Sequence, residues 1–152
     1  GDLTVVDRPG DDVQQVADII CDIRDRGLLP EKLAIGVDSA GIGDIVDELT
    51  TQERGITMEQ IVAISQGWKL NGAIKTTERK LANGTLWHDG SSLMAWCVGN
   101  LKIEATATTI RATKANAGDA KIDPAMAMFD AVTVMSRNPE AAREPQYQMM
   151  VF

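Results

Sequence analysis

The stretch from Leu33 to Asp44, LAIGVDSAGIGD, constrains the fold more than any other part of this chain. The apolar run from Leu33 to Val37 has the length and composition of a strand buried on both faces. This run stops at Asp38, a glycine-containing turn follows, and an amphipathic stretch begins at Ile42. The pattern predicts a strand, a turn and a helix.

This pattern places Asp38 at the carboxyl end of a strand, where open α/β sheets bind their ligands. A carboxylate at that edge offers oxygen ligands to a hard cation such as Mg²⁺. The competing interpretation is that Asp38 only forms the turn or caps the following helix. The Gly-x-Gly of residues 41–43 is a weak signal, because it lacks the third glycine of a dinucleotide fingerprint and the lysine of a phosphate loop.

Composition and charge narrow the class of protein. The chain has 152 residues, 44% hydrophobic and 24% charged, which is typical of one globular domain with its own core. A net charge of −7 does not favour nucleic-acid binding, since phosphate binding rests on Lys and Arg. An acidic metal site can still act on nucleic acid where a local basic patch and bound cations offset the field.

The remaining sequence alternates short apolar runs with amphipathic segments, the order of a parallel α/β sheet with crossover helices. Strands are expected at residues 3–6, 33–37 and 61–64, with a strand or hairpin within 103–113. Helices are expected after Asp11, over 42–54, over 70–81, after Ser91 and over 124–137. We assign residues 1–137 to the domain and 138–152 to a C-terminal tail, whose apolar residues are Tyr147, Met149, Met150, Val151 and Phe152.

One face of the 70–81 helix is apolar, and basic residues gather on or just before the other face. The simplest interpretation of such a face is a solvated helix surface. The competing interpretation is a patch that contacts DNA phosphates. The residues concerned are Lys69, Lys75, Arg79 and Lys80.

Several single residues have structural interpretations. Cys21 and Cys97 lie among apolar neighbours and are interpreted as core thiols. His88 is the single histidine of the chain, and it is interpreted as a surface or hydrogen-bonded residue rather than a metal ligand. The tryptophans are interpreted as core anchors rather than base-stacking residues; they are Trp68, Trp87 and Trp96.

A second candidate acid, Asp123, stands where the last helix begins, in the sequence KIDP. Because Asp before Pro is typical of a helix N-terminus, the competing interpretation of Asp123 is a helix cap. Asp130 follows seven residues later, on roughly the same face of an apolar helix. A buried acid needs a partner, so the sequence predicts one for Asp130.

The order and spacing of these pieces resemble the C-terminal nuclease domain of the large terminase subunit of tailed bacteriophages. The resemblance covers most of residues 3–137. It rests on residues 36–41 (GVDSAG), residues 66–75 (QGWKLNGAIK) with Glu78 and Arg79, residues 86–88 (LWH), residues 93–96 (LMAW) with Asn100, and residues 121–127 (KIDPAMA).

The resemblance implies a ribonuclease-H-like fold, a mixed sheet flanked by helices, with Mg²⁺ or Mn²⁺ held between acidic residues. On matching positions, Asp38 and Asp123 would be the catalytic acids and the metal ligands. The family cuts concatemeric phage DNA at the start and end of packaging. The implied partners are therefore double-stranded DNA, the phage portal and the small terminase subunit, and the implied location is the cytoplasm of the bacterial host.

The family also has a first strand with a further catalytic aspartate, and this sequence has no counterpart to it. We therefore expect a sheet that lacks its first strand, weak or absent cleavage by this chain alone, and self-association through the exposed sheet edge. Two alternatives remain open. One is another ribonuclease-H-like nuclease such as a resolvase, which fold alone does not separate from a terminase. The other is a non-enzymatic module that binds a portal or partner subunit through its last helix and tail.

Overall fold

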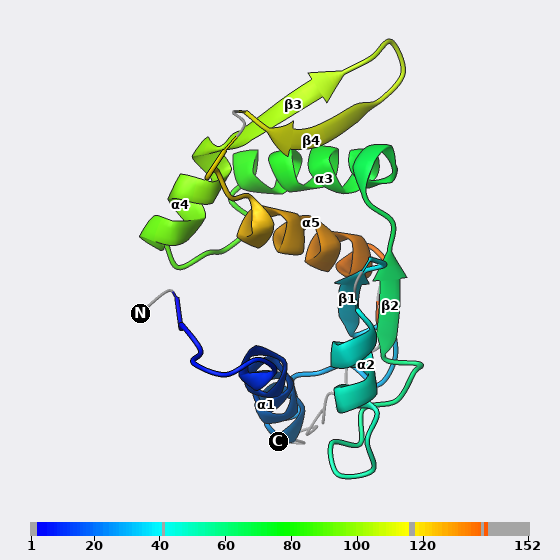
Figure 1. Ribbon diagram of the computed structural model, residues 1–152. Coiled ribbons are helices and arrows are strands. Elements are labelled where there is room, and N and C mark those ends of the chain that lie inside the picture. The colour runs from blue at the N-terminus through cyan, green and yellow to red at the C-terminus, as the bar shows by residue number, and fades with distance from the viewer. Residues whose placement is uncertain (1–2, 41, 116–117, 138, 140–152) are drawn as a thin grey trace, which may run out of the picture.

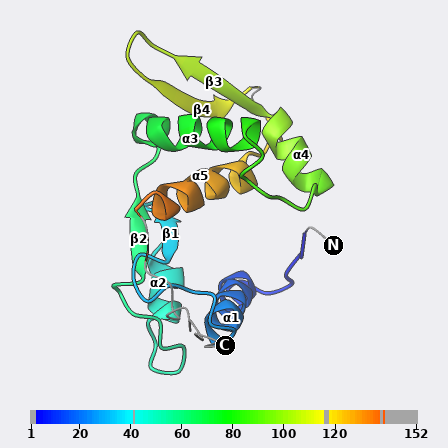
Figure 2. The ribbon, with the colours of Figure 1, turned by 180° about the vertical axis from the view of Figure 1, so that it is seen from behind.

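A computed structural model describes residues 3–40, 42–115, 118–137 and 139. These residues form a mixed α/β domain in which α5 separates α1 and α2 from α3 and a β-hairpin (Figures 1 and 2). The predicted α/β class is thereby confirmed.

In chain order the elements are α1 (Asp11–Asp25), β1 (Ile35–Asp38), α2 (Gly43–Leu49), β2 (Ile61–Ile64), the 3₁₀ turn η1 (Gly67–Leu70), α3 (Asn71–Ala82), α4 (Ser92–Gly99), β3 (Leu101–Ala105), β4 (Ile110–Lys114) and α5 (Asp123–Met135).

The described strands form two separate two-stranded sheets. β1 and β2 are parallel, with Ile35 opposite Ile61 and Asp38 opposite Ile64. Parallel neighbours require a crossover connection, and here that connection contains α2, as the sequence predicts. β3 and β4 form an antiparallel hairpin, which agrees with the hairpin expected within residues 103–113.

The main core lies where α5 packs against β1, β2 and α3. Side chains alternate along a strand, and Gly36 is on the face of β1 that meets α5. A Cβ atom at Gly36 would lie 2.8 Å from Val134 Cγ2 and 3.3 Å from the backbone oxygen of Asp130. The helix therefore packs directly on the strand backbone. The buried residues of this core are Val62, Ile64, Leu70, Ala73, Ile74, Phe129, Val132 and Val134.

A second, smaller core joins α1 and α2 around Ala17, Leu29, Leu49 and Ile56. The side chain of Arg54, in the segment after α2, forms hydrogen bonds with residues of α1 and α2. Its Nε donates to Glu48 Oε1 at 2.9 Å, its Nη2 donates to Gln14 Oε1 at 2.9 Å, and it also pairs with Asp18. The hydrogen bond from Arg54, and then that from Gln14, hold the pKa of Glu48 below its usual value.

Three predicted elements differ from the structure. Residues 3–6 form no strand, and Leu3 and Val5 are 75% and 81% exposed. The predicted 33–37 strand begins only at Ile35, because Leu33 has a φ of 51°, and it is half-buried rather than fully buried. The predicted 42–54 helix ends at Leu49, since the chain then turns toward Gly55, which has a φ of 68°.

The interpretation of the tryptophans as core anchors is wrong. Trp68, Trp87 and Trp96 are 38%, 90% and 48% exposed. The guanidinium of Arg111 lies 4.6 Å from the centre of the Trp68 ring, which is a cation–π contact at the surface. The low aromatic content of the chain, 4%, suggested that each ring anchors the core, but short helices and loops present these rings outward.

Other local predictions are confirmed. Ser91 caps α4, because its side chain accepts a hydrogen bond from the Met94 amide at 3.2 Å. Cys21 and Cys97 are buried free thiols. His88 is exposed, and its Nδ1 accepts a hydrogen bond from the Gly90 amide at 3.1 Å. The tail predicted over residues 138–152 lies outside the described residues except for Pro139.

None of the described helices combines the length and the apolar character needed to cross a membrane.

The close approach at Gly36 gives a stability prediction. Replacing Gly36 with Ala should lower the free energy of unfolding by about 1–3 kcal/mol, because the new methyl group overlaps Val134. Gly72→Ala is the matched control, since a Cβ atom there meets nothing within 4 Å. That control should be neutral or stabilising by up to about 1 kcal/mol. Urea unfolding followed by circular dichroism measures both, and equal effects would contradict the packing described.

Candidate functional site

The candidate site lies at the carboxyl edge of the β1–β2 pair. Asp38 is the last residue of β1 and stands opposite Ile64, the last residue of β2. Because the strands are parallel, both end at the same edge, and Gln66 follows two residues after Ile64. The predicted placement of Asp38 at a strand end is confirmed.

Asp38 itself is exposed and takes part in the turn after β1. Its Oδ1 accepts a hydrogen bond from the Ala40 amide at 3.0 Å, a local turn that is common for Asp. Among the described residues, none donates a hydrogen bond to its Oδ2. The turn interpretation is therefore correct, and one carboxylate oxygen still remains available for a ligand.

The acid that the structure places near Asp38 is Asp130. Asp130 lies on the α5 turn that contacts Gly36 and is only 8% exposed. The Gln66 side-chain amide donates to Asp130 Oδ1 at 3.1 Å and Oδ2 at 3.3 Å, and also to the Ile64 backbone oxygen at 3.3 Å. Gln66 is thus the partner that the sequence predicts for this buried acid, and it comes from the segment that follows β2.

The electrostatics of Asp130 follow from this arrangement. Burial raises the pKa of the Asp130 carboxyl group above its usual value, the hydrogen bond from Gln66 opposes that rise, and the charge of Asp38 adds to it. The described residues contribute no ion pair to Asp130. The ionised carboxylate is therefore stabilised by one neutral amide and destabilised by a nearby like charge, an environment that a cation would improve.

Asp123 occupies a different position. It is the exposed first residue of α5, and Ile122 is the N-cap residue, so the interpretation of Asp123 as the helix cap is wrong. The seven residues to Asp130 correspond to about 10 Å along the helix axis. α5 begins beside α4 and ends beside β1 (Figures 1 and 2). The sharing of a cation between Asp38 and Asp123 stays a prediction.

The predicted basic residues are on and next to α3. Lys69, Lys75 and Arg79 are exposed, and Lys80 is half-buried. None of the four forms an ion pair within the part of the chain that the structure describes. Lys75 and Arg79 are one turn apart and share a helix face. Lys69 follows Gln66 by three residues and so lies close along the chain to the candidate site.

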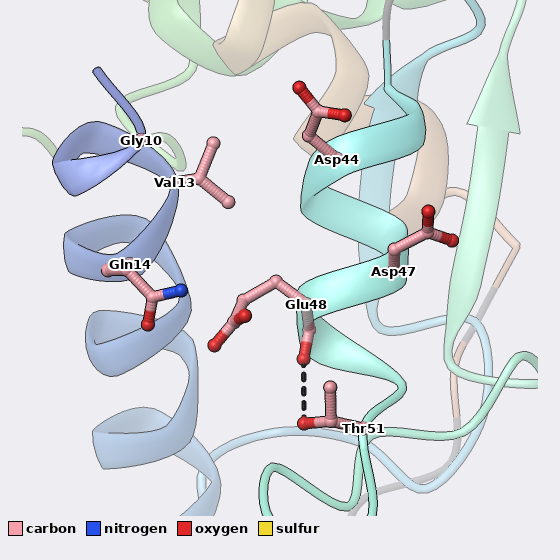
Figure 3. Close-up of a pocket in the computed structure, with 7 residues that line it drawn as sticks. All are labelled: Gly10, Val13, Gln14, Asp44, Asp47, Glu48 and Thr51. Carbon is pink, nitrogen blue, oxygen red and sulfur yellow. Dashed lines mark hydrogen bonds between the residues drawn. The ribbon is translucent and has the colours of Figure 1, made fainter.

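A second acidic region lies in a cleft of about 420 Å³ between α1 and α2. In Figure 3 the Glu48 side chain extends toward Gln14 on α1, whereas Asp47 points away from α1. The carboxylates therefore do not converge on a common point. Glu48 is also paired with Arg54 at 2.9 Å, so this cleft is a poor candidate for a cation site.

Divalent cations are compatible with the donors at the β1–β2 edge. Within the described ranges there is no cluster of three or more His, Cys, Asp or Glu side chains that could hold a metal ion. Mg²⁺, however, is usually held by one or two carboxylates, with water and substrate phosphate oxygens completing its shell. The free oxygen of Asp38 and the carboxylate of Asp130 satisfy that requirement chemically.

The fold and this edge define a class: a mixed α/β domain with one acid at the carboxyl end of a parallel strand and a second acid on the helix that packs against that strand. One family model, the terminase large subunit endonuclease domain, matches residues 1–138. The chain therefore belongs to the family of terminase large subunit endonuclease domains, which supports an endonuclease role in DNA packaging. Neither the curated proteins nor the solved structures gave a match.

Sequence reasoning missed Gln66 as a site residue and did not pair Asp130 with Asp38. Gln66 follows a strand and precedes Gly67, so it has the pattern of an ordinary turn residue. The sequence feature that pointed to this contact was Asp130 itself. An acid within an apolar helix requires a polar partner from another element. Only the packing of α5 on Gly36 identifies the strand ends that supply this partner.

The raised pKa of Asp130 predicts a specific pH dependence. The folded state binds this proton more tightly than the unfolded state, so ionisation costs stability as pH rises from about 4 through the folded-state pKa. Asp130→Asn removes this cost. The stability of the Asn variant relative to the natural chain should therefore increase with pH across that window. Urea unfolding at a series of pH values measures this difference, with the exposed Asp119→Asn as control. A difference that is the same at every pH would contradict the electrostatic account.

Proposed function

We propose that this chain is a divalent-metal-dependent DNA endonuclease domain of a bacteriophage packaging terminase, which cuts concatemeric DNA. The observation that supports it most is the carboxyl edge of the β1–β2 pair, where exposed Asp38 lies near buried Asp130. The family match over residues 1–138 supplies the packaging context. In that context the portal and the small terminase subunit are proposed partners, and the cytoplasm of the bacterial host is the proposed location.

In this proposal Mg²⁺ or Mn²⁺ is held at the edge by Asp38, with Asp123 as the second catalytic acid. When bound, such an ion polarises the scissile phosphate and lowers the pKa of a water molecule. The residues of this chain have three tasks. Asp38 binds the ion through its free oxygen. Asp130 adds negative charge close to it, and Gln66 fixes the orientation of Asp130.

The distribution of charge supports a DNA-contacting side. Residues 1–60 contain five Lys and Arg against fourteen Asp and Glu, whereas residues 61–139 contain nine against six. The first group forms α1, β1 and α2, and the second forms β2, η1, α3, α4, the hairpin and α5. α1 and α2 lie on the opposite side of α5 from α3 and the hairpin in Figure 1. The overall negative charge therefore does not prevent phosphate contacts on the α3 side.

The structure argues against docking through the last helix. α5 is enclosed by β1, α3 and α4, and Ala125, Phe129 and Val132 are buried inside the described fold. The apolar character of α5 is thus explained by internal packing. A non-enzymatic module that binds its partner through this helix is accordingly the weaker proposal.

Cation binding is the first test of this proposal. At a hundredfold excess over its dissociation constant, a bound ion raises the free energy of unfolding by about 2.7 kcal/mol. Mn²⁺ should therefore raise the melting temperature of the natural chain, and Asp38→Asn should abolish most of that rise. Asp7→Asn, an exposed acid outside the site, should keep it. Asp123→Asn tests the second acid, and an unchanged Mn²⁺ response in the Asp38 variant would refute the site.

DNA binding is the second test. The double variant Lys75→Glu, Arg79→Glu should weaken binding of a fluorescent DNA duplex and reduce the salt dependence of the binding constant. For each phosphate that the protein no longer neutralises, the slope of log K against log salt becomes shallower by about 0.9. Lys32→Glu is the control, since this residue lies in the acidic half and pairs with Glu59. Equal slopes in the double variant and the natural chain would exclude the α3 face as the DNA-binding surface.

A further inference from the structure

An apolar groove runs between α3, α4 and α5, away from the β1–β2 edge. It consists of two adjoining cavities of about 350 and 380 Å³. Leu81, Val98 and Met128 line both cavities, so the two are continuous. We call this feature the α3–α4 groove.

The walls of the α3–α4 groove are mostly apolar and are open to solvent. Leu81 and Val98 are 47% and 46% exposed although they are large and hydrophobic. Phe129, Leu101 and Ile110 line the cavity of about 380 Å³. Exposed apolar surface that is continuous and concave is unfavourable in water and often marks a binding site.

The chain contains a segment of matching chemistry. Residues 147–152 read YQMMVF, of which only Gln148 is not apolar. Methionine side chains are flexible and fill irregular apolar cavities well. The sequence pattern of this segment is not explained by the fold of the described residues or by the proposed nuclease site.

Chain length allows the segment to reach the groove. The groove contacts α5 at Met128 and Phe129, about 10 Å along the helix from Met135. Residues 140–146 follow the last described residue, Pro139, and about seven extended residues span about 23 Å. A tether of this length also gives an effective concentration in the millimolar range.

We propose that residues 147–152 of this chain occupy the α3–α4 groove. This proposal is independent of the proposed nuclease function, because it uses none of the residues at the β1–β2 edge. It also does not require that the chain ends at Phe152.

The test uses the full-length chain and a synthetic fluorescent peptide, YQMMVF. In the tail variant, Met149, Met150, Val151 and Phe152 are replaced by Ser, which leaves the groove free for the peptide. The peptide should bind this variant at least tenfold more tightly than it binds the natural chain, where the tethered segment competes. Fluorescence anisotropy measures both affinities.

Matched variants locate the binding. Added to the tail variant, Leu81→Asp should abolish peptide binding, whereas Met58→Asp should not, because Met58 is 65% exposed and lies outside the groove. Circular dichroism should show an unchanged fold in both variants.

Three results would overturn the proposal. One is equal peptide affinity for the natural chain and the tail variant, and another is no binding to either. The third is a mass from sedimentation that rises with protein concentration in the natural chain but stays that of a monomer in the Leu81→Asp variant. That result would identify a second copy of the chain as the occupant of the groove.

Discussion

The close packing of α5 on the backbone of β1 determines most of this structure. Gly36 has no side chain, and a methyl group in its place would lie 2.8 Å from Val134. Because the helix sits so near the strand, the Asp130 turn of α5 lies beside the carboxyl end of β1. A larger residue at position 36 would move the helix outward and separate Asp130 from Asp38 and Gln66. One glycine therefore sets both the main core and the geometry of the candidate site.

The same packing creates an electrostatic imbalance. Asp130 is withdrawn from water yet receives hydrogen bonds from the neutral amide of Gln66 rather than from a cation. A buried carboxylate in this condition marks a candidate functional site. The nearby exposed Asp38 increases the negative potential at the edge. We propose that a divalent cation binds at this negative potential, as part of the endonuclease role that membership of the terminase family supports.

Much of the fold could be predicted from local patterns in the sequence. The strand–turn–helix around Asp38, the β2 strand, α3 and the Ser91 cap all depend on nearby residues, and the structure contains them. The 3–6 strand was predicted wrongly because a short run such as LTVV does not show whether a partner strand is present. The tryptophans were predicted wrongly because composition does not show which side of a short helix faces the core.

The site was predicted only in part for a related reason. Asp38 could be found because a strand end is a local feature. Asp130 and Gln66 are far apart in the sequence, and their contact depends on how α5 crosses β1 and β2, which no local pattern encodes. Asp123 was selected by its resemblance to a family motif, and the structure places it about two turns of α5 away from Asp130.

The most direct test of the central claim is a crystal structure of the chain soaked in Mn²⁺, with the anomalous signal of manganese recorded. The account predicts a peak within about 2.0–2.3 Å of an Asp38 carboxylate oxygen, the range of metal–oxygen distances for hard cations. A second oxygen ligand from Asp130 or Asp123 would show which acid shares the ion. Well-ordered Asp38 without an anomalous peak at saturating Mn²⁺ would contradict the claim that this edge is a metal site.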